Sequence, residues 1–412
     1  MKILVVSNLY PPHHLGGYEL GCRDVVEKLR ERGHEIRVLA GDFRSSNVGD
    51  LDDGVMRSLL FRTEGGSGRG RKLAECRGFF RLIREFSPDL VYFWSQAGLS
   101  HWLPLVVRLA GLPMAFFLSD TSFVSWRVGA WLGGFANRPG VFASFVRYAL
   151  GRTVPVRGYP IVKGRTCHFA SDFLRTVALK DGIQFSSATS EVIHWGIETG
   201  KFAVSDRPRR THSKLLFVGR LSPAKGLHTA LAALALLVVH QGLSDLTLTV
   251  VGEGPDRDYS AKIRNLPTQL RIPERVTFVG ELPRSELPRI YGEHDILIFP
   301  SEWEEPFAIT PLEAMASGLV VVGTVTGGSG ELFRNRENAM TFAAGDAEDC
   351  ARAIRELVQD RALFESIASA GKEYVLTNHT LNSMVDHIEA SLRSVGHSLE
   401  QSDRGQLSGV RE

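Results

Sequence analysis

The sequence predicts an α/β protein with two doubly wound parallel-sheet domains. Apolar strand-like runs alternate with helical segments along the chain, which is typical of repeated βαβ units. This rhythm is broken over residues 121–160 and restarts after a polar, basic stretch at residues 205–213. The chain has 412 residues, whereas a single domain usually has roughly 100–200, so two domains of similar size are expected.

The first domain opens with a pattern that predicts a strand, a Pro/Gly-rich loop, a helix and a second strand. These four segments are residues 3–7, 11–17, 18–32 and 34–39. A first strand that is apolar throughout indicates a parallel sheet buried on both faces. Further strands of this domain are expected at residues 90–93, 114–118, 166–170 and 191–194.

The second domain repeats the alternation after the linker candidate at residues 205–213. Its expected strands are residues 214–218, 246–251, 276–279, 296–299 and 319–322. An Ala/Leu-rich helix is expected over residues 226–240, and the last helical segments run to about Val395. We therefore predict an N-terminal domain at residues 1–200 and a C-terminal domain at residues 201–380. A closing helix at residues 381–395 is expected to pack back on the N-terminal domain, and residues 396–412 are expected to form a mobile tail.

The composition excludes several classes of protein. Lys and Arg total 48 against 46 Asp and Glu, so the chain carries no overall field for binding nucleic acid. The four cysteines are far apart and form no CxxC pair, which fits a reducing compartment and no zinc site. No apolar stretch reaches the 18 residues of a spanning helix, and the N-terminal run is too short for a signal peptide. The protein is therefore expected to be cytoplasmic.

The most informative stretch is EWEEPFAITPLEA, residues 302–314, which directly follows an expected strand. The carboxyl edge of an open α/β sheet is where ligands bind. Thr310, Pro311 and Glu313 have the pattern of a helix start, so Glu313 could be half of a capping box. The same geometry would also point backbone N–H groups at a diphosphate, with the carboxylate suited to ribose hydroxyls. The residues alone leave both interpretations open.

Two cations occupy the expected loop between the strand at residues 214–218 and the following helix. Arg220 and Lys225 could lie on an ordinary solvated loop. They could equally form a phosphate clamp, in which arginine is a fork-shaped donor and lysine a point charge.

Two further segments are rich in glycine. Gly16 and Gly17 follow the first strand and would let backbone approach a ligand closely, although such turns are common. The segment 252–254 begins like a GxGxxG fingerprint, but Arg257 stands in place of the third glycine, so that interpretation fails. The pair at residues 52–53 has no neighbouring metal ligands, so no metal site is expected.

Six segments follow one another in an order that is improbable by chance. They are the Gly16-Gly17 loop, GRLSPAKG (219–226), VGEGP (251–255), VTFVGEL (276–282), EPFAITPLE (305–313) and TGGSGEL (326–332). Together they resemble a family 4 glycosyltransferase of the GT-B fold, with an EX7E motif at residues 305–313. The resemblance covers nearly the whole chain and is strongest over residues 214–335.

This resemblance implies a GT-B architecture, with two Rossmann-like domains facing a central cleft. It implies retaining transfer of a sugar from a nucleotide-diphosphate sugar, with no metal and no cofactor, to a hydroxyl of a glycan, glycolipid or small molecule. The implied catalytic residues are Arg220 and Lys225, which would stabilise the diphosphate, and Glu305, which would contact the donor sugar. The implied donor-binding residues are Gly16, Gly17, Gly219, Glu281, Leu282, Phe307, Ala308, Ile309 and Glu313.

The acceptor side departs from the family pattern. Many members have His after the strand that matches residues 114–118, often followed by Asp, and here Ser119 and Asp120 stand there. A hydroxyl cannot replace an imidazole as an acid or base. Ser119, Asp120 and His101 are therefore the acceptor-side candidates. A donor-binding protein with weak or lost catalysis and a sugar-nucleotide 2-epimerase remain as alternatives.

Residues 57–85 contain eight basic and three acidic residues, with aromatic and aliphatic residues between them. Together with the Trp- and Arg-rich residues 121–157, this segment could dock the N-terminal domain on the inner face of an anionic bilayer, where a lipid-linked acceptor would be found. The alternative is a solvated basic face over an ordinary amphipathic core helix.

Overall fold

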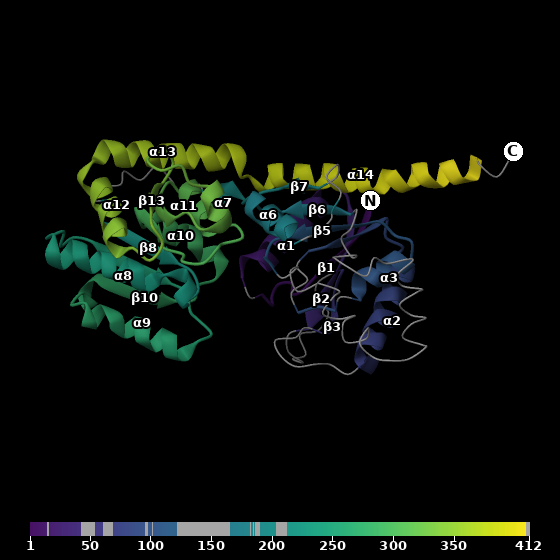
Figure 1. Cartoon of the computed structure of the whole chain (residues 1–412), viewed down its shortest axis with the longest axis horizontal. Coiled ribbons are helices and arrows are strands. Elements are labelled where there is room, and N and C mark those ends of the chain that lie inside the picture. The colour runs from purple at the N-terminus through teal and green to yellow at the C-terminus, as the bar shows by residue number, and fades with distance from the viewer. Residues whose placement is uncertain are drawn as a thin grey trace. The chain divides into compact units, whose positions relative to one another are not determined.

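The computed structural model divides into two compact α/β units (Figure 1). Unit 1 comprises Met1–His194 and Met384–Glu412, and unit 2 comprises Trp195–Ser383. The structure describes residues 1–14, 16–42, 54–60, 69–94, 98–100, 102–121, 165–181, 183, 185, 190–202 and 212–408. Both units have the doubly wound topology that the sequence predicts. The linker candidate at residues 205–213 and the segment 121–160 lie almost entirely outside the described residues.

In the described part of unit 1, seven parallel strands form a sheet in the order β3-β2-β1-β4-β5-β6-β7. They are β1 Lys2–Ser7, β2 Glu35–Asp42, β3 Val55–Leu60, β4 Leu90–Phe93, β5 Met114–Leu118, β6 Thr166–Phe169 and β7 Glu191–Val192. Strand β3 was not expected from the sequence. Arg57 and Ser58 interrupt its apolar run, because this edge strand is buried on alternate residues only.

The helices of unit 1 bury one apolar stripe each. They include α1 Gly17–Glu31, α2 Arg69–Phe86, α3 Leu103–Leu109 and α6 Asp172–Lys180. In α1 the buried stripe is Cys22, Val25, Val26 and Leu29, at the spacing of one helix face. The turn after α1 contains Gly33, whose φ of +86° favours glycine.

In unit 2 the strands of the described sheet are also parallel, in the order β10-β9-β8-β11-β12-β13. They are β8 Lys214–Val218, β9 Thr247–Val251, β10 Val276–Gly280, β11 Ile296–Phe299, β12 Val320–Thr324 and β13 Met340–Phe342. The strand order reverses between β8 and β11. In a doubly wound sheet, this reversal is the switch point at which ligands bind.

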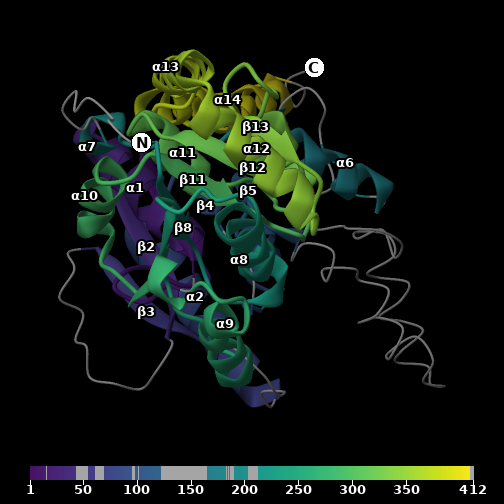
Figure 2. The same cartoon turned by 90° about the vertical axis from the view of Figure 1, so that its left-hand side faces the viewer.

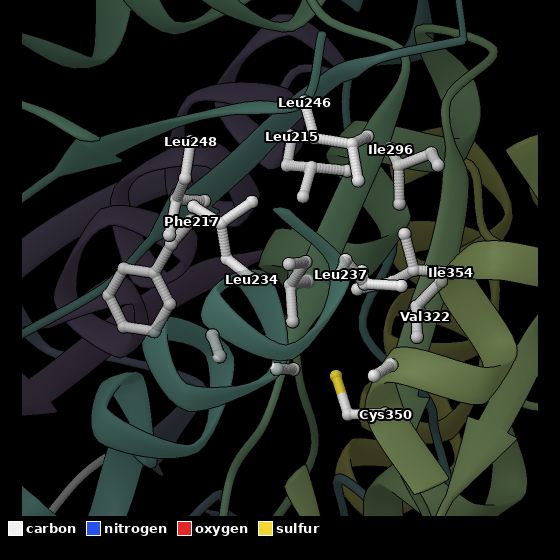
Figure 3. Close-up of a cluster of buried hydrophobic side chains, with 14 of the residues drawn as sticks. Leu215, Phe217, Leu234, Leu237, Leu246, Leu248, Ile296, Val322, Cys350 and Ile354 are labelled. Atoms are coloured by element: carbon white, nitrogen blue, oxygen red, sulfur yellow. The ribbon is translucent and has the colours of Figure 1, made fainter. Parts of the chain in front are cut away.

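Helices cover both faces of this second sheet (Figure 2). One group is α8 Leu227–Ala235, α9 Arg257–Gln269 and α12 Ala347–Gln359, and the other is α7 Thr199–Phe202, α10 Leu287–Gly292, α11 Thr310–Ala316 and α13 Arg361–Asn378. A single π-helical segment, Leu236–His240, continues α8. Figure 3 shows the core beneath α8 and α12, where Leu234 and Ile354 meet side chains from the central strands.

The last helix corrects the predicted end of the chain. Helix α14 spans Leu381–Ser408, so residues 396–408 continue the helix that we expected to stop at about residue 395. From Met384 onward this helix belongs to unit 1. Arg32 lies 2.7 Å from Asp386 and 2.9 Å from Glu389, and these ion pairs fasten α14 to the turn after α1.

Candidate functional site

Five loops that carry the quoted motifs follow β8, β9, β10, β11 and β12. Because all five strands are parallel, their carboxyl ends lie at one edge of the unit 2 sheet. A backbone hydrogen bond joins the two loops on either side of the switch point, since the amide of Glu302 donates to the carbonyl of Ala224 at 2.9 Å. The fold thus brings GRLSPAKG and the EX7E motif together.

Lys225 and Glu305 form the polar centre of this edge. The Nζ of Lys225 lies 2.5 Å from Oε1 of Glu305, and the Ser301 hydroxyl donates to the same oxygen at 2.6 Å. Glu305 is buried, with 4% of its surface exposed, so these two donors take the place of water around its Oε1. An ammonium has three N–H donors, and the ion pair uses one of them. Ser301 was not singled out from the sequence, although it immediately follows β11 and Pro300.

Glycines at two points let neighbouring loops close on Glu305. Gly226 has φ of +65°, and a Cβ there would lie 1.9 Å from the carbonyl oxygen of Pro300. Gly327 has φ of +57°, and a Cβ there would lie 2.5 Å from the carbonyl oxygen of Glu305. The next amide, that of Gly328, donates to this same carbonyl at 2.6 Å. Both motifs need glycine because the backbones touch.

The VGEGP segment has a packing role that the failed dinucleotide fingerprint did not suggest. A Cβ on Gly252 would lie 2.0 Å from the carbonyl oxygen of Gly219, and one on Gly254 would lie 2.0 Å from that of Leu221. The amide of Leu221 donates to Glu253 O at 3.0 Å. These contacts hold the loop that presents Arg220, whose side chain is exposed.

Glu313 is not part of a capping box. Helix α11 begins at Thr310 with Ile309 as its cap and no side-chain cap, so the predicted start is shifted by one residue. Instead the Glu313 carboxylate is buried, and the Tyr291 hydroxyl donates to its Oε2 at 3.0 Å. The Nε of Arg284 lies 3.8 Å from its Oε1. Neither partner had a sequence signal, because both come from the segment between β10 and β11.

The remaining donor-side candidates lie on the same edge. Phe307 and Ala308 are buried, and Ile309 is half-buried at the start of α11. The Phe307 ring packs 5.9 Å from that of His379. Glu281 is exposed and Leu282 half-buried, directly after β10.

The described unit 1 candidates lie at the carboxyl edge of their own sheet. The buried Glu19 carboxylate accepts from the Gly16 amide at 3.1 Å and from Asn8 at 3.0 Å, which fixes the loop before Gly17. Ser119 is buried after β5, and its hydroxyl has no hydrogen-bond partner in the described structure.

The other acceptor-side candidates lie differently. Asp120 is half-buried next to Ser119, and His101 lies outside the described residues.

Comparisons with known proteins agree with this arrangement. The family model described as glycosyl transferases group 1 matches residues 203–374, and the glycosyl transferase 4-like domain matches residues 16–156. A Mycobacterium tuberculosis glycogen synthase is 34% identical over 403 residues, which is 90% of each chain. A GDP-mannose-dependent alpha-mannosyltransferase of Mycolicibacterium smegmatis is 28% identical, covering 95% of this chain and 98% of the relative.

Solved structures share the fold at lower identity. A Rickettsia africae glycosyltransferase has a TM-score of 0.73 at 18% identity, covering 96% of this chain and 98% of its own. The Anabaena protein HepE, solved with UDP and glucose, has a TM-score of 0.70 at 21% identity, covering 96% and 100%.

Two doubly wound units with motif-bearing loops at a carboxyl sheet edge define an enzyme of the GT-B class, a glycosyltransferase. The sequence comparisons are more specific than the fold. The chain belongs to the group 1, family 4-like glycosyltransferases.

Proposed function

We propose that this enzyme is a retaining glycosyltransferase that moves a sugar from a nucleotide-diphosphate sugar to a hydroxyl of a glycan, glycolipid or small molecule. The observation that carries the proposal is the grouping of Arg220, Lys225, Glu305 and Glu313 at one carboxyl edge of the unit 2 sheet. Such a site combines cations for a diphosphate with carboxylates for sugar and ribose hydroxyls.

Each charged group has a role that suits its chemistry. Arg220 and Lys225 stabilise the departing diphosphate, because fixed cations need no reorganisation as negative charge develops. Glu305 contacts the donor sugar, and Ser301 and Lys225 hold its Oε1 in place. Glu313 takes the ribose hydroxyls. Residues 281–282 flank the base, and backbone near Phe307 meets sugar and phosphate.

The proposed reaction keeps the anomeric configuration and uses no divalent metal. The acceptor hydroxyl attacks the anomeric carbon from the side of the leaving group, and the bond from that carbon to the diphosphate oxygen breaks. The hydroxyl proton passes to the departing phosphate. Similar proteins support a nucleotide-sugar donor, since HepE was solved with UDP and the mycobacterial mannosyltransferase depends on GDP-mannose.

Nucleotide release from a panel of UDP-, GDP- and ADP-sugars, with candidate acceptors, tests this proposal. We expect turnover with one donor, unchanged by EDTA, and a product whose anomeric proton coupling matches that of the donor. Glu305→Gln should retain nucleotide binding and lose turnover. Binding without turnover across the panel, or an inverted product, would contradict the proposal.

We also propose that unit 1 contacts the membrane as a peripheral, cytoplasmic protein and takes a lipid-linked acceptor there. Among the described helices, none is long and apolar enough to cross a bilayer. Phe80 on α2 is 42% exposed and Leu109 on α3 is 77% exposed, and both line a groove of about 480 Å³. Arg77, Arg81 and Arg84 are exposed on the same helix as Phe80. An apolar patch beside cations suits an anionic lipid surface.

Liposome pelleting tests this contact. We expect the enzyme to pellet with vesicles that contain anionic lipid at low salt, and to remain in solution with neutral vesicles. The double variant Phe80→Ser with Leu109→Ser should lose binding. A matched control is Leu376→Ser, which changes a 41% exposed leucine in unit 2. Absence of pelleting at low salt would contradict membrane contact and leave the donor site unaffected.

A further inference from the structure

The second carboxylate of the EX7E motif, Glu313, is held by side chains that the motif does not include. Tyr291 is fully buried in α10, and its hydroxyl donates to Glu313 Oε2 at 3.0 Å. Arg284, in the short turn before α10, has its Nε 3.8 Å from Oε1. Each oxygen of the carboxylate therefore has its own neighbouring donor.

Tyr291 is a donor with a fixed position. Its ring lies edge-on to Phe202, with 6.0 Å between ring centroids, and α10 packs against both α7 and α11. Burial, and next the Glu313 charge, raise the pKa of Tyr291 well above its ordinary value. The hydroxyl therefore keeps its proton at neutral pH and acts as the donor in its hydrogen bond to Glu313. A phenylalanine at this position would keep the ring and remove only that donor.

We propose that Tyr291 is a positioning residue for Glu313 and that it makes the donor site selective for ribose over deoxyribose. The proposal rests on the proposed function, in which Glu313 accepts the ribose hydroxyls. A glutamate side chain has three rotatable bonds, and ordering it on binding costs free energy. Tyr291 fixes one oxygen before the ligand arrives, so that Oε1 is presented at the place where a ribose hydroxyl donates.

Calorimetric titration of the full-length enzyme with UDP, GDP and ADP tests this role. The nucleotide that binds is then compared with its 2′-deoxy and 3′-deoxy analogues. We expect the wild-type enzyme to bind one deoxy analogue about tenfold more weakly, the effect of losing a hydrogen bond to a charged group. Tyr291→Phe should bind the ribonucleotide about tenfold more weakly and distinguish the two forms by about twofold or less.

Two controls separate positioning from general damage. Phe202→Leu loosens the packing of the Tyr291 ring but keeps its hydroxyl, so the ribose preference should remain. Glu313→Gln should reduce the preference as Tyr291→Phe does. If Tyr291→Phe keeps the wild-type ratio of ribonucleotide to deoxynucleotide affinity, positioning is refuted while donor binding stands. If no nucleoside diphosphate binds the wild-type enzyme, the proposed function itself fails.

Discussion

Lys225 and Glu305 are the pair of residues on which the proposed chemistry of the site depends most. Glu305 is buried, and its Oε1 lies 2.5 Å from the Nζ of Lys225 and 2.6 Å from the Ser301 hydroxyl. A buried ion pair is costly to break on one side, since the remaining charge has lost its partner. In the proposed mechanism, folding stability and catalysis therefore depend on the same contact, and a double substitution can separate the two effects.

We expect Lys225→Met to lower both the thermal midpoint and the rate of sugar transfer. The midpoint falls because Glu305 keeps only Ser301 as a donor among the described residues, and turnover falls about 100-fold or more because the diphosphate loses a cation. Adding Glu305→Gln should restore most of the midpoint but none of the activity. Thermal melts and initial rates of the three variants check this. Recovery of activity in the double variant would mean that Lys225 acts only by neutralising Glu305.

Ser119 gives a second prediction at the scale of one residue. Its buried hydroxyl has no partner in the described structure, so Ser119→Ala should change the thermal midpoint little. If Ser119 contacts the acceptor, this variant should raise the acceptor KM several-fold and leave the donor KM unchanged. Steady-state kinetics with each substrate varied in turn check this. An unchanged acceptor KM would remove Ser119 from the acceptor site.

At the scale of elements, the apolar central strands were predictable and the pairings between loops were not. Strands such as β11, Ile296–Phe299, are buried on both faces and stand out as apolar runs. The edge strand β3 was missed because only alternate residues are buried. The hydrogen bond from Tyr291 to Glu313 depends on how α10 packs against α11. No local sequence pattern encodes this packing. The glycines of VGEGP were visible, but their packing partner was not.

The loop contacts predict that substituting two glycines of similar backbone conformation lowers the folding stability by different amounts. Gly226 has φ of +65°, and a Cβ there would lie 1.9 Å from the carbonyl oxygen of Pro300. Gly242 has φ of +71°, and a Cβ there would have no atom within 4 Å. Gly242→Ala should cost about 1 kcal/mol, the strain of a left-handed residue. Gly226→Ala should cost more and weaken nucleotide binding, because Lys225 moves with the loop. Denaturant titration and calorimetry check this, and equal costs for the two variants would contradict the close packing.

At the scale of the whole molecule, helix α14 connects the two units along the chain. It begins at Leu381 in unit 2 and belongs to unit 1 from Met384 onward. Its buried side reaches the unit 1 sheet through His168, which lies 2.8 Å from Ser391 and 2.9 Å from the Tyr92 hydroxyl. Burial lowers the pKa of His168 to about 3, so this link is neutral at physiological pH.

The ion pairs of α14 predict a pH dependence of stability. Hydrogen bonds from Arg32, Arg393 and His34 lower the pKa of Glu389 from 4.5 to about 2. A lowered native pKa stabilises the fold above about pH 4.5, and the contribution is lost as the pH falls towards 2. Glu389→Gln should cost about 1–2 kcal/mol at pH 7, because solvent screens part of the effect. Denaturation at pH 7 and 3.5 should show that the difference in unfolding free energy between wild type and Glu389→Gln becomes smaller at low pH. A difference that stays constant would contradict the lowered pKa of Glu389.

The proposed function depends most on binding of the nucleotide-sugar donor at the carboxyl edge of the unit 2 sheet. A crystal soaked with the donor that the release assay selects tests it most directly. We predict diphosphate density beside Arg220 and Lys225, the ribose against Glu313 and the sugar against Glu305. Density for the nucleotide at another edge, or a sugar in contact with Glu313 in place of the ribose, would contradict the account.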